Sequence, residues 1–314
     1  MIEELIRRLD NPLSTIAYPT KPINHSDTGH VVYGLDPSIN AAMADREIVG
    51  PVQVVRRPGL GDKIFGLAAA YAFCQQNPDM DVTFAGLDTD TWLKQIPWVK
   101  TGINPDCNTV VNLDNTPCNG GDRVELMAGI LGVRGPVSIE FPITVPRKKL
   151  GLKKPYFVFA PWAARKGPRS LPTATVISLL KNSPIPLALT DSVRAEYEVG
   201  DGNTNCTGLG MLDLLVLLSE SAGVVGCDTG VVWLGQAMSR PALCFFSHVA
   251  ACDRSMTTRN LMAVKSPASC AANCGDHCGT MPECRFKDRV PLCTSFYTPE
   301  FMRFQMREFE RLTV

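Results

Sequence analysis

Residues 219–247 read SESAGVVGCDTGVVWLGQAMSRPALCFFS, and the order of apolar and polar residues in this stretch indicates the fold class. It begins with an apolar strand at 223–226 and a polar turn at 227–230. A helical run at 231–238 and a second apolar strand at 242–246 follow. Strand, turn, helix and strand in this order make a βαβ unit, whose turn lies at the carboxyl end of the first strand. The stretch therefore predicts a parallel α/β sheet with a ligand-facing turn.

The turn at 227–230 has the chemistry of a phosphate site. Backbone N–H groups at a helix start carry partial positive charge, Thr229 adds a hydroxyl, and Gly230 lets a ligand approach the backbone closely. Asp228 could equally cap the helix in an ordinary βα turn. The turn alone is compatible with both interpretations.

A second βαβ unit lies earlier in the chain. It consists of a strand at 52–55, the loop RRPGLGD from Arg56 to Asp62, a helix at 64–75 and a strand at 82–85. A dinucleotide fingerprint would need a glycine at position 64, where the chain has Ile64, and no Gly-Lys-Ser/Thr of a Walker A loop occurs. These features argue against NAD and P-loop nucleotide sites.

Taken together, the two motifs resemble those of glycosyltransferase family 9, the heptosyltransferase family. The matching residues are Asp228-Thr229-Gly230 in the second half, and RRPGLGD followed by Asn77-Pro78-Asp79 in the first. The resemblance covers about residues 52–250. It implies an α/β protein with two Rossmann-like domains facing across a cleft, the GT-B fold. It also implies inverting, metal-independent transfer of a sugar from a nucleotide-diphosphate donor.

The expected domains are 1–150, which would hold the acceptor, and 151–314, which would hold the donor. In the resembling family the aspartate of the first motif is the catalytic base, which here would be Asp62. A sugar hydroxyl must lose a proton as it attacks, and a carboxylate can take it. Asp62 could also cap the helix that follows. Arg57, Gly59 and Gly61 would belong to the same acceptor or phosphate loop.

The donor side of the resemblance adds a basic loop at 161–171. Its candidate cations are Arg165, Lys166 and Arg169, which would stabilise the charge that develops on a diphosphate leaving group. Asp191 stands where the family often has an acidic residue for the ribose, although it could instead cap a helix expected at 193–197.

Trp233 marks a departure from the family, which has a histidine at this position. An indole at this place could stack on a base or sugar, or pack between helix and sheet. The departure supports an alternative function, a non-catalytic protein of the same fold that binds a nucleotide or phosphate ligand.

A cysteine-rich segment at 270–293 holds five of the twelve cysteines and one histidine. Four of these six residues could form a structural zinc site. Free thiols, disulfides, an iron–sulfur cluster, or an interaction surface for a partner remain alternatives. The candidate ligands are Cys270, Cys274, Cys278, Cys284, Cys293 and His277.

Composition and the chain ends complete the predictions. The 31 basic and 31 acidic residues cancel, so net charge does not indicate a nucleic-acid partner. No apolar run reaches the ~18 residues of a membrane span, and the amino terminus is charged, so a cytoplasmic protein is expected. The family's default acceptor, lipopolysaccharide core, would place it at the inner face of the membrane.

Residues 1–50 would cover a sheet edge or shape an acceptor site, and a last helix at 298–312 would cross back to the first domain.

Overall fold

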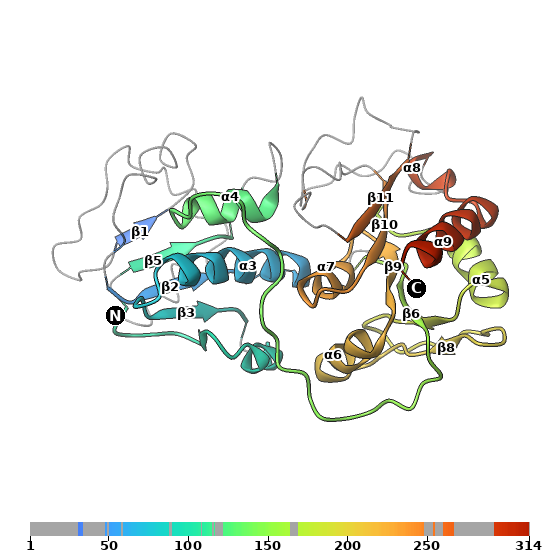
Figure 1. Ribbon diagram of the computed structural model, residues 1–314, viewed down its shortest axis with the longest axis horizontal. Helices are drawn as coiled ribbons and strands as arrows, with labels where there is room; N and C mark the ends of the chain where they lie inside the picture. Colours follow the sequence, from blue (N-terminus) through green and yellow to red (C-terminus); the bar gives the residue numbers. More distant parts are fainter. Residues whose placement is uncertain are drawn as a thin grey trace.

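The computed structural model describes residues 31–33, 48, 50–57, 59–87, 90–107, 109–114, 116, 122–163, 169–247, 254, 260–266 and 292–313. These residues form two α/β domains that lie side by side, each built on its own sheet (Figure 1). Every described pair of neighbouring strands is parallel. None of the described helices combines the length and hydropathy that a bilayer span requires.

The first domain has a five-stranded sheet in the order β1-β5-β2-β3-β4. Its strands are β1 (Val31–Tyr33), β2 (Val52–Val55), β3 (Val82–Ala85), β4 (Lys100–Thr101) and β5 (Thr109–Asn112). Its helices are α3 (Leu60–Gln76), the 3-10 helix η1 (Thr91–Gln95) and α4 (Arg123–Ile130). Strand β1 comes from the amino-terminal extension and pairs with β5 at the edge of the sheet, in agreement with the expected cover of a sheet edge.

Helix α3 begins four residues earlier than its apolar run suggested. Gly59 adopts a φ of 67°, which turns the chain sharply after β2, and the helix starts at the next residue. Gly61 and Asp62 therefore belong to the first helical turn. The N-cap residue is Gly59, so the predicted capping role of Asp62 is wrong. Its carboxylate is engaged by arginines instead, as described below.

The second domain has a six-stranded sheet in the order β11-β10-β9-β6-β7-β8. Its strands are β6 (Phe157–Ala160), β7 (Leu187–Leu189), β8 (Thr204–Asn205), β9 (Gly223–Cys227), β10 (Ala242–Phe246) and β11 (Leu261–Lys265). Its helices are α5 (Thr173–Asn182), α6 (Met211–Glu220), α7 (Gly230–Ala237), α8 (Leu292–Ser295) and α9 (Pro299–Thr313).

Two apolar layers cover this second sheet, because successive residues of a strand point to opposite faces. One layer, with α5 and α9, buries Phe157, Phe159, Leu243 and Phe245. The other, with α6 and α7, buries Val158, Val224, Cys244 and Phe246. This α/β/α arrangement explains why the strands read as continuous apolar runs.

Helix α9 packs within the second domain, so the prediction that it crosses back to the first domain is wrong. Its apolar side chains Met302, Met306 and Phe309 are buried in the same layer as α5, and the Phe309 ring lies 5.5 Å from that of Phe157. Arg303 Nη2 donates a hydrogen bond of 2.9 Å to Ser178 Oγ on α5. The apolar face of the helix is therefore used by its own domain.

The two domains meet where α3 and α7 pack together. The rings of Phe65 on α3 and Trp233 on α7 lie 5.2 Å apart. The connecting segment contributes Phe141, whose N–H donates to Ala237 O at 3.4 Å and whose ring contacts Trp98. One apolar cluster consequently runs through both domains.

Candidate functional site

Strand order predicts where ligands bind in this fold. In the first sheet, β2 lies between β3 and β5. In the second sheet, β6 lies between β7 and β9. In open parallel sheets, ligands bind outside the carboxyl ends of the strands at such a switch point. The relevant positions follow β2 and β5 in the first domain, and β6 and β9 in the second.

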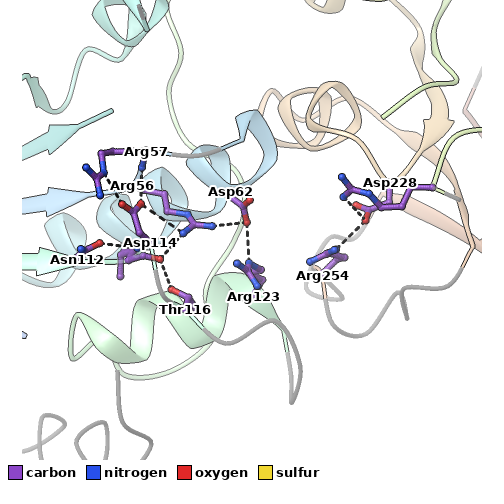
Figure 2. A network of polar contacts seen from close by, with 11 residues as sticks. Arg56, Arg57, Asp62, Asn112, Asp114, Thr116, Arg123, Asp228 and Arg254 are labelled. Carbon is purple, nitrogen blue, oxygen red and sulfur yellow. Dashed lines mark hydrogen bonds and ion pairs between the residues drawn. The ribbon is translucent and has the colours of Figure 1, made fainter. Parts of the chain in front are cut away.

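A polar network occupies the switch point of the first sheet (Figure 2). Arg57 donates to both oxygens of Asp114, from its backbone N–H and from Nε, each at 2.8 Å. Arg56 Nη1 donates to Leu113 O at 2.8 Å and lies 3.7 Å from Asp114 Oδ1. The two arginines after β2 are thus fixed by residues that follow β5.

Asp62 extends this network toward the second domain. Its Oδ1 lies 2.9 Å from Arg56 Nη2 and 3.1 Å from Arg123 Nε. Both arginine side chains are buried, whereas that of Asp62 is 33% exposed. Among the described residues, Asp62 Oδ2 has no hydrogen-bond partner. Two guanidinium groups therefore orient the carboxylate while one oxygen stays available.

The switch point of the second sheet is organised by Asp228, which is buried. Its Oδ2 lies 3.1 Å from Arg254 Nε and 3.5 Å from Arg169 Nη1, and its Oδ1 accepts a 3.0 Å hydrogen bond from Trp233 Nε1. Burial alone would raise the pKa of Asp228, but Arg254, Arg169 and the Trp233 N–H together hold it below its ordinary value. The N-cap of α7 is Thr229, so the alternative capping role of Asp228 is wrong.

The two networks meet at the domain junction. The N–H of Arg123 donates to Arg254 O at 2.9 Å, and Figure 2 shows Asp62 and Arg123 facing Arg254 and Asp228. Five guanidinium groups share these networks with three carboxylates, an excess of two positive charges. Such an excess favours an anionic ligand.

Gly61 and Gly230 both lie at this junction, where they face each other. A Cβ on Gly230 would lie 2.8 Å from Gly61 N and 2.6 Å from Leu60 Cβ. The missing side chain of Gly230 therefore lets the first domain approach this position, where a ligand was expected. Thr229 is partly exposed beside it.

Trp233 follows the packing alternative. Its side chain is 1% exposed and lies between the rings of Phe65 and Phe246, 5.2 Å and 6.2 Å away. Its indole N–H is used by Asp228. A ring enclosed in this way presents no face to a nucleotide.

Asp191 lies just beyond the carboxyl end of β7, partly exposed. The predicted helix at 193–197 is wrong, since residues 193–199 run without helical structure. The Asp191 carboxylate accepts weak hydrogen bonds from Ser192 Oγ at 3.3 Å and Val193 N at 3.5 Å. It caps no helix, and its carboxylate remains accessible at the edge of the sheet.

Several candidate residues fall outside the described part of the chain. They are Arg165, Lys166, Cys270, Cys274, Cys278, Cys284 and His277. Cys293 is described and is buried. Within the described ranges, no group of three or more His, Cys, Asp or Glu side chains could hold a metal ion.

Sequence reasoning did not select Arg56, Asp114, Arg123 and Arg254. Arg56 lies in the quoted loop RRPGLGD, and Asp114 stands two residues after the end of β5, so the switch-point rule could have indicated both. Arg123 is the first residue of α4. Arg254 follows no recognisable motif, and its contact with Asp228 arises from the tertiary fold.

No protein-family model matches the chain, and no curated protein matches it in sequence. Solved structures do resemble it. The iron-containing dodecameric glycosyltransferase TibC from enterotoxigenic E. coli H10407 is 16% identical with a TM-score of 0.64, over 83% of this chain and 78% of that one. TibC has also been solved in complex with ADP-D-β-D-heptose.

Two further structures support the same comparison. A glycosyl transferase family 9 protein from Veillonella parvula is 9% identical with a TM-score of 0.63, over 84% of this chain and 98% of that one. The E. coli ADP-heptose lipopolysaccharide heptosyltransferase II is 11% identical with a TM-score of 0.59, over 82% and 98%. The predicted α/β fold with two Rossmann-like domains, the GT-B arrangement, is confirmed, and at the level of the fold so is the resemblance to family 9.

Proposed function

We propose that the protein is a glycosyltransferase that moves a sugar from a nucleotide-diphosphate donor to an acceptor hydroxyl. The observation that carries this proposal is the position of Asp62. Its carboxylate, held by Arg56 and Arg123, faces the Asp228–Arg254 pair of the other domain across the junction (Figure 2). In a GT-B fold this arrangement brings a proton acceptor on one domain to an anion site on the other.

Asp62 acts as the general base in this proposal. The acceptor hydroxyl gives its proton to Asp62 Oδ2, and its oxygen forms a bond to the anomeric carbon of the donor sugar. The bond from that carbon to the diphosphate breaks, and the electron pair leaves with the nucleotide. A single displacement of this kind inverts the anomeric configuration. A base must have a free oxygen that the acceptor hydroxyl can reach. Asp62 Oδ2 has no partner among the described residues, and the side chain is 33% exposed.

The second domain holds the leaving group. Arg169, which is 30% exposed and is positioned by Asp228, would contact the diphosphate. Arg165 and Lys166 of the same loop, together with Thr229 and the N-terminal N–H groups of α7, would add further donors. Arg254 is more deeply buried beside Asp228 and would act by holding the site together.

Of the acceptor-side loop, Arg57 would contact the acceptor or a phosphate. It is partly exposed and fixed by two hydrogen bonds to Asp114. Gly59 and Gly61 would shape the loop, since Gly59 has a left-handed backbone and a Cβ there would lie 3.0 Å from Asp62 Oδ2.

An ADP-activated heptose is the first donor to test. TibC binds ADP-D-β-D-heptose, and the E. coli heptosyltransferase II is named for ADP-heptose. The acceptor would be a glycan hydroxyl, with lipopolysaccharide core as the default that the resemblance implies. Asp191, beyond β7, would hold the ribose.

We further propose that the cysteine-rich segment holds a structural metal ion through four of its six candidate ligands. Thiolate and imidazole ligands suit both zinc and iron, and TibC is described as iron-containing. The transfer chemistry itself is assigned to Asp62 and the arginines.

A thermal-shift screen against nucleotide-diphosphate sugars, followed by product analysis, tests the proposal. The expected result is stabilisation by an ADP-sugar and release of ADP when a glycan acceptor is added. Binding without any transfer or hydrolysis would instead support the non-catalytic alternative.

A further inference from the structure

A stacked aromatic pair lies beside the proposed donor site. The rings of Trp162 and Tyr197 are 5.3 Å apart with an interplanar angle of 28°. Trp162 stands two residues beyond the end of β6, and Tyr197 lies in the segment that follows β7. Trp162 therefore lies at the carboxyl edge of the second sheet, next to its switch point, and Tyr197 joins it there through the ring contact.

The segment that carries Tyr197 is held in place by hydrogen bonds at the end of β8. The N–H of Ala195 donates to Thr207 Oγ1 at 3.1 Å, and Ala195 O accepts from Asn205 Nδ2 at 2.7 Å. The N–H of Gly208 donates to Asp191 O at 2.9 Å. These bonds replace the expected helix and anchor the segment two residues before Tyr197.

Trp162 belongs to the loop at 161–171, which also carries the phosphate candidate Arg169. The N–H of Leu171 donates to Pro161 O at 2.8 Å, and the N–H of Ala163 donates to Ser170 Oγ at 3.1 Å. These two bonds close the base of the loop that bears Arg169, which lies 3.5 Å from Asp228. By strand order, the Arg169–Asp228 pair lies beside β9 and β6, Trp162 follows β6, and Asp191 follows the neighbouring strand β7.

Exposure distinguishes Trp162 from most of the other tryptophans. Trp92 and Trp233 are 2% and 1% exposed, whereas Trp162 and Tyr197 are both partly exposed. Among the described residues, neither the Trp162 indole N–H nor the Tyr197 hydroxyl has a hydrogen-bond partner. The pair therefore has accessible ring surface and two accessible polar ends.

We propose that Trp162 and Tyr197 form the platform on which the nucleobase of the donor stacks. This inference rests on the proposed function, because it assumes a nucleotide donor at the second domain. Every base has a π-face, and a base–aromatic stack is favourable and tolerant of base identity. Stacking on the base, one of the two alternatives for Trp233, is thereby assigned to Trp162.

The test measures binding of ADP, GDP, UDP, CDP and inorganic pyrophosphate by calorimetry. Trp162→Leu and Tyr197→Leu keep apolar bulk and remove one ring each. The matched control is Trp98→Leu, which removes a ring from the comparable Tyr71–Trp98 pair in the first domain, where the rings lie 4.9 Å apart. We expect the two platform variants to weaken the tightest nucleoside diphosphate about tenfold, as a lost stack should, and to leave pyrophosphate binding unchanged. The control should alter neither.

Tryptophan fluorescence gives an independent readout that does not depend on the affinity of a variant. A stacked base should quench the wild-type chain and the Trp98→Leu chain equally, and should not quench the Trp162→Leu chain. Equal nucleotide affinity in the wild-type and both platform variants, with quenching retained in Trp162→Leu, would overturn the platform.

The outcomes separate this inference from the proposed function. Nucleotide binding that depends on Trp162, without any sugar transfer, would contradict the function and support the platform. Sugar transfer with nucleotide binding that does not depend on Trp162 would support the function and contradict the platform. A wild-type chain that binds none of the four nucleotides contradicts both.

Discussion

Gly61 of the first domain and Gly230 of the second face each other at close range at the domain junction. A Cβ on Gly230 would stand 2.8 Å from Gly61 N, and one on Gly61 would stand 3.0 Å from Trp233 Cδ1. The starts of α3 and α7 can approach this closely because neither residue has a side chain. This contact sets Asp62 and Asp228, one residue after Gly61 and two before Gly230, at a fixed separation across the junction.

Gly230→Ala should push α3 and α7 apart. The added methyl meets backbone at Gly61 N, which cannot move aside as a flexible side chain can, so we expect a loss of about 1–3 kcal/mol of stability. Thermal unfolding and sugar-transfer rate should both fall. Gly129→Ala on α4 is the matched control, since nothing lies within 4 Å of a Cβ there. A Gly230→Ala protein that unfolds and works like the wild type would show that the contact is looser than described.

Asp228→Asn should destabilise the second domain, because it removes the buried carboxylate that lies 3.1 Å from Arg254 Nε. We expect a loss of about 3 kcal/mol in the free energy of unfolding. The control is Asp213→Asn, which removes an exposed pair with Lys148 and should cost about 0–1 kcal/mol. Denaturant unfolding measures both, and an equal loss in the two variants would contradict the role of Asp228.

The pH dependence of stability gives a second test of Asp228. Its pKa in the folded protein lies below the ordinary value of 3.8, so the charged form binds protons less readily than in the unfolded chain. The resulting stabilisation is present above pH 3.8 and is lost as pH falls through the lowered value. Between pH 3.8 and that lowered value, the wild-type unfolding temperature should therefore fall more steeply than that of Asp228→Asn. Parallel curves would argue against a depressed pKa.

Arg169→Ala should weaken binding of a nucleoside diphosphate and of pyrophosphate alike, because the lost contact is with phosphate. A charge-assisted hydrogen bond is worth about 1.5–3 kcal/mol, which corresponds to roughly a 10- to 150-fold loss of affinity. Lys181→Ala, which removes an exposed cation paired with Glu198 away from the junction, is the control. If Arg169→Ala bound pyrophosphate like the wild type, the loop would have no role in holding the diphosphate.

The cysteine-rich segment predicts a bound metal in the purified protein. Elemental analysis of protein prepared without chelators should find one equivalent of zinc or iron per chain, and Cys278→Ser with Cys284→Ser should remove it. Cys74→Ser, a substitution in α3, should leave the metal content unchanged. Metal-free wild-type protein of normal stability would exclude a structural metal.

Local sequence was sufficient for the βαβ units but insufficient for the contacts between them. The alternation of apolar runs with turns predicted β9, α7 and β10 closely, since each is set by neighbours in the chain. The failed helix at 193–197 was decided by Asn205 and Thr207, which bind Ala195 from outside the segment. The burial of Trp233 depends on Phe65, which lies in the other domain. No local pattern could reveal either contact.

The proposed role of Asp62 as the base of a sugar transfer is tested by Asp62→Asn. The amide keeps an oxygen for Arg56 and Arg123 but cannot take a proton, and Asp81→Asn, on an exposed pair with Lys100, is the control. The measurement is the rate of donor turnover together with the dissociation constant of the donor. We expect Asp62→Asn to lower the rate about 100- to 10,000-fold while donor affinity stays unchanged. Wild-type turnover in Asp62→Asn, or a loss of activity explained by lost donor binding, would contradict it.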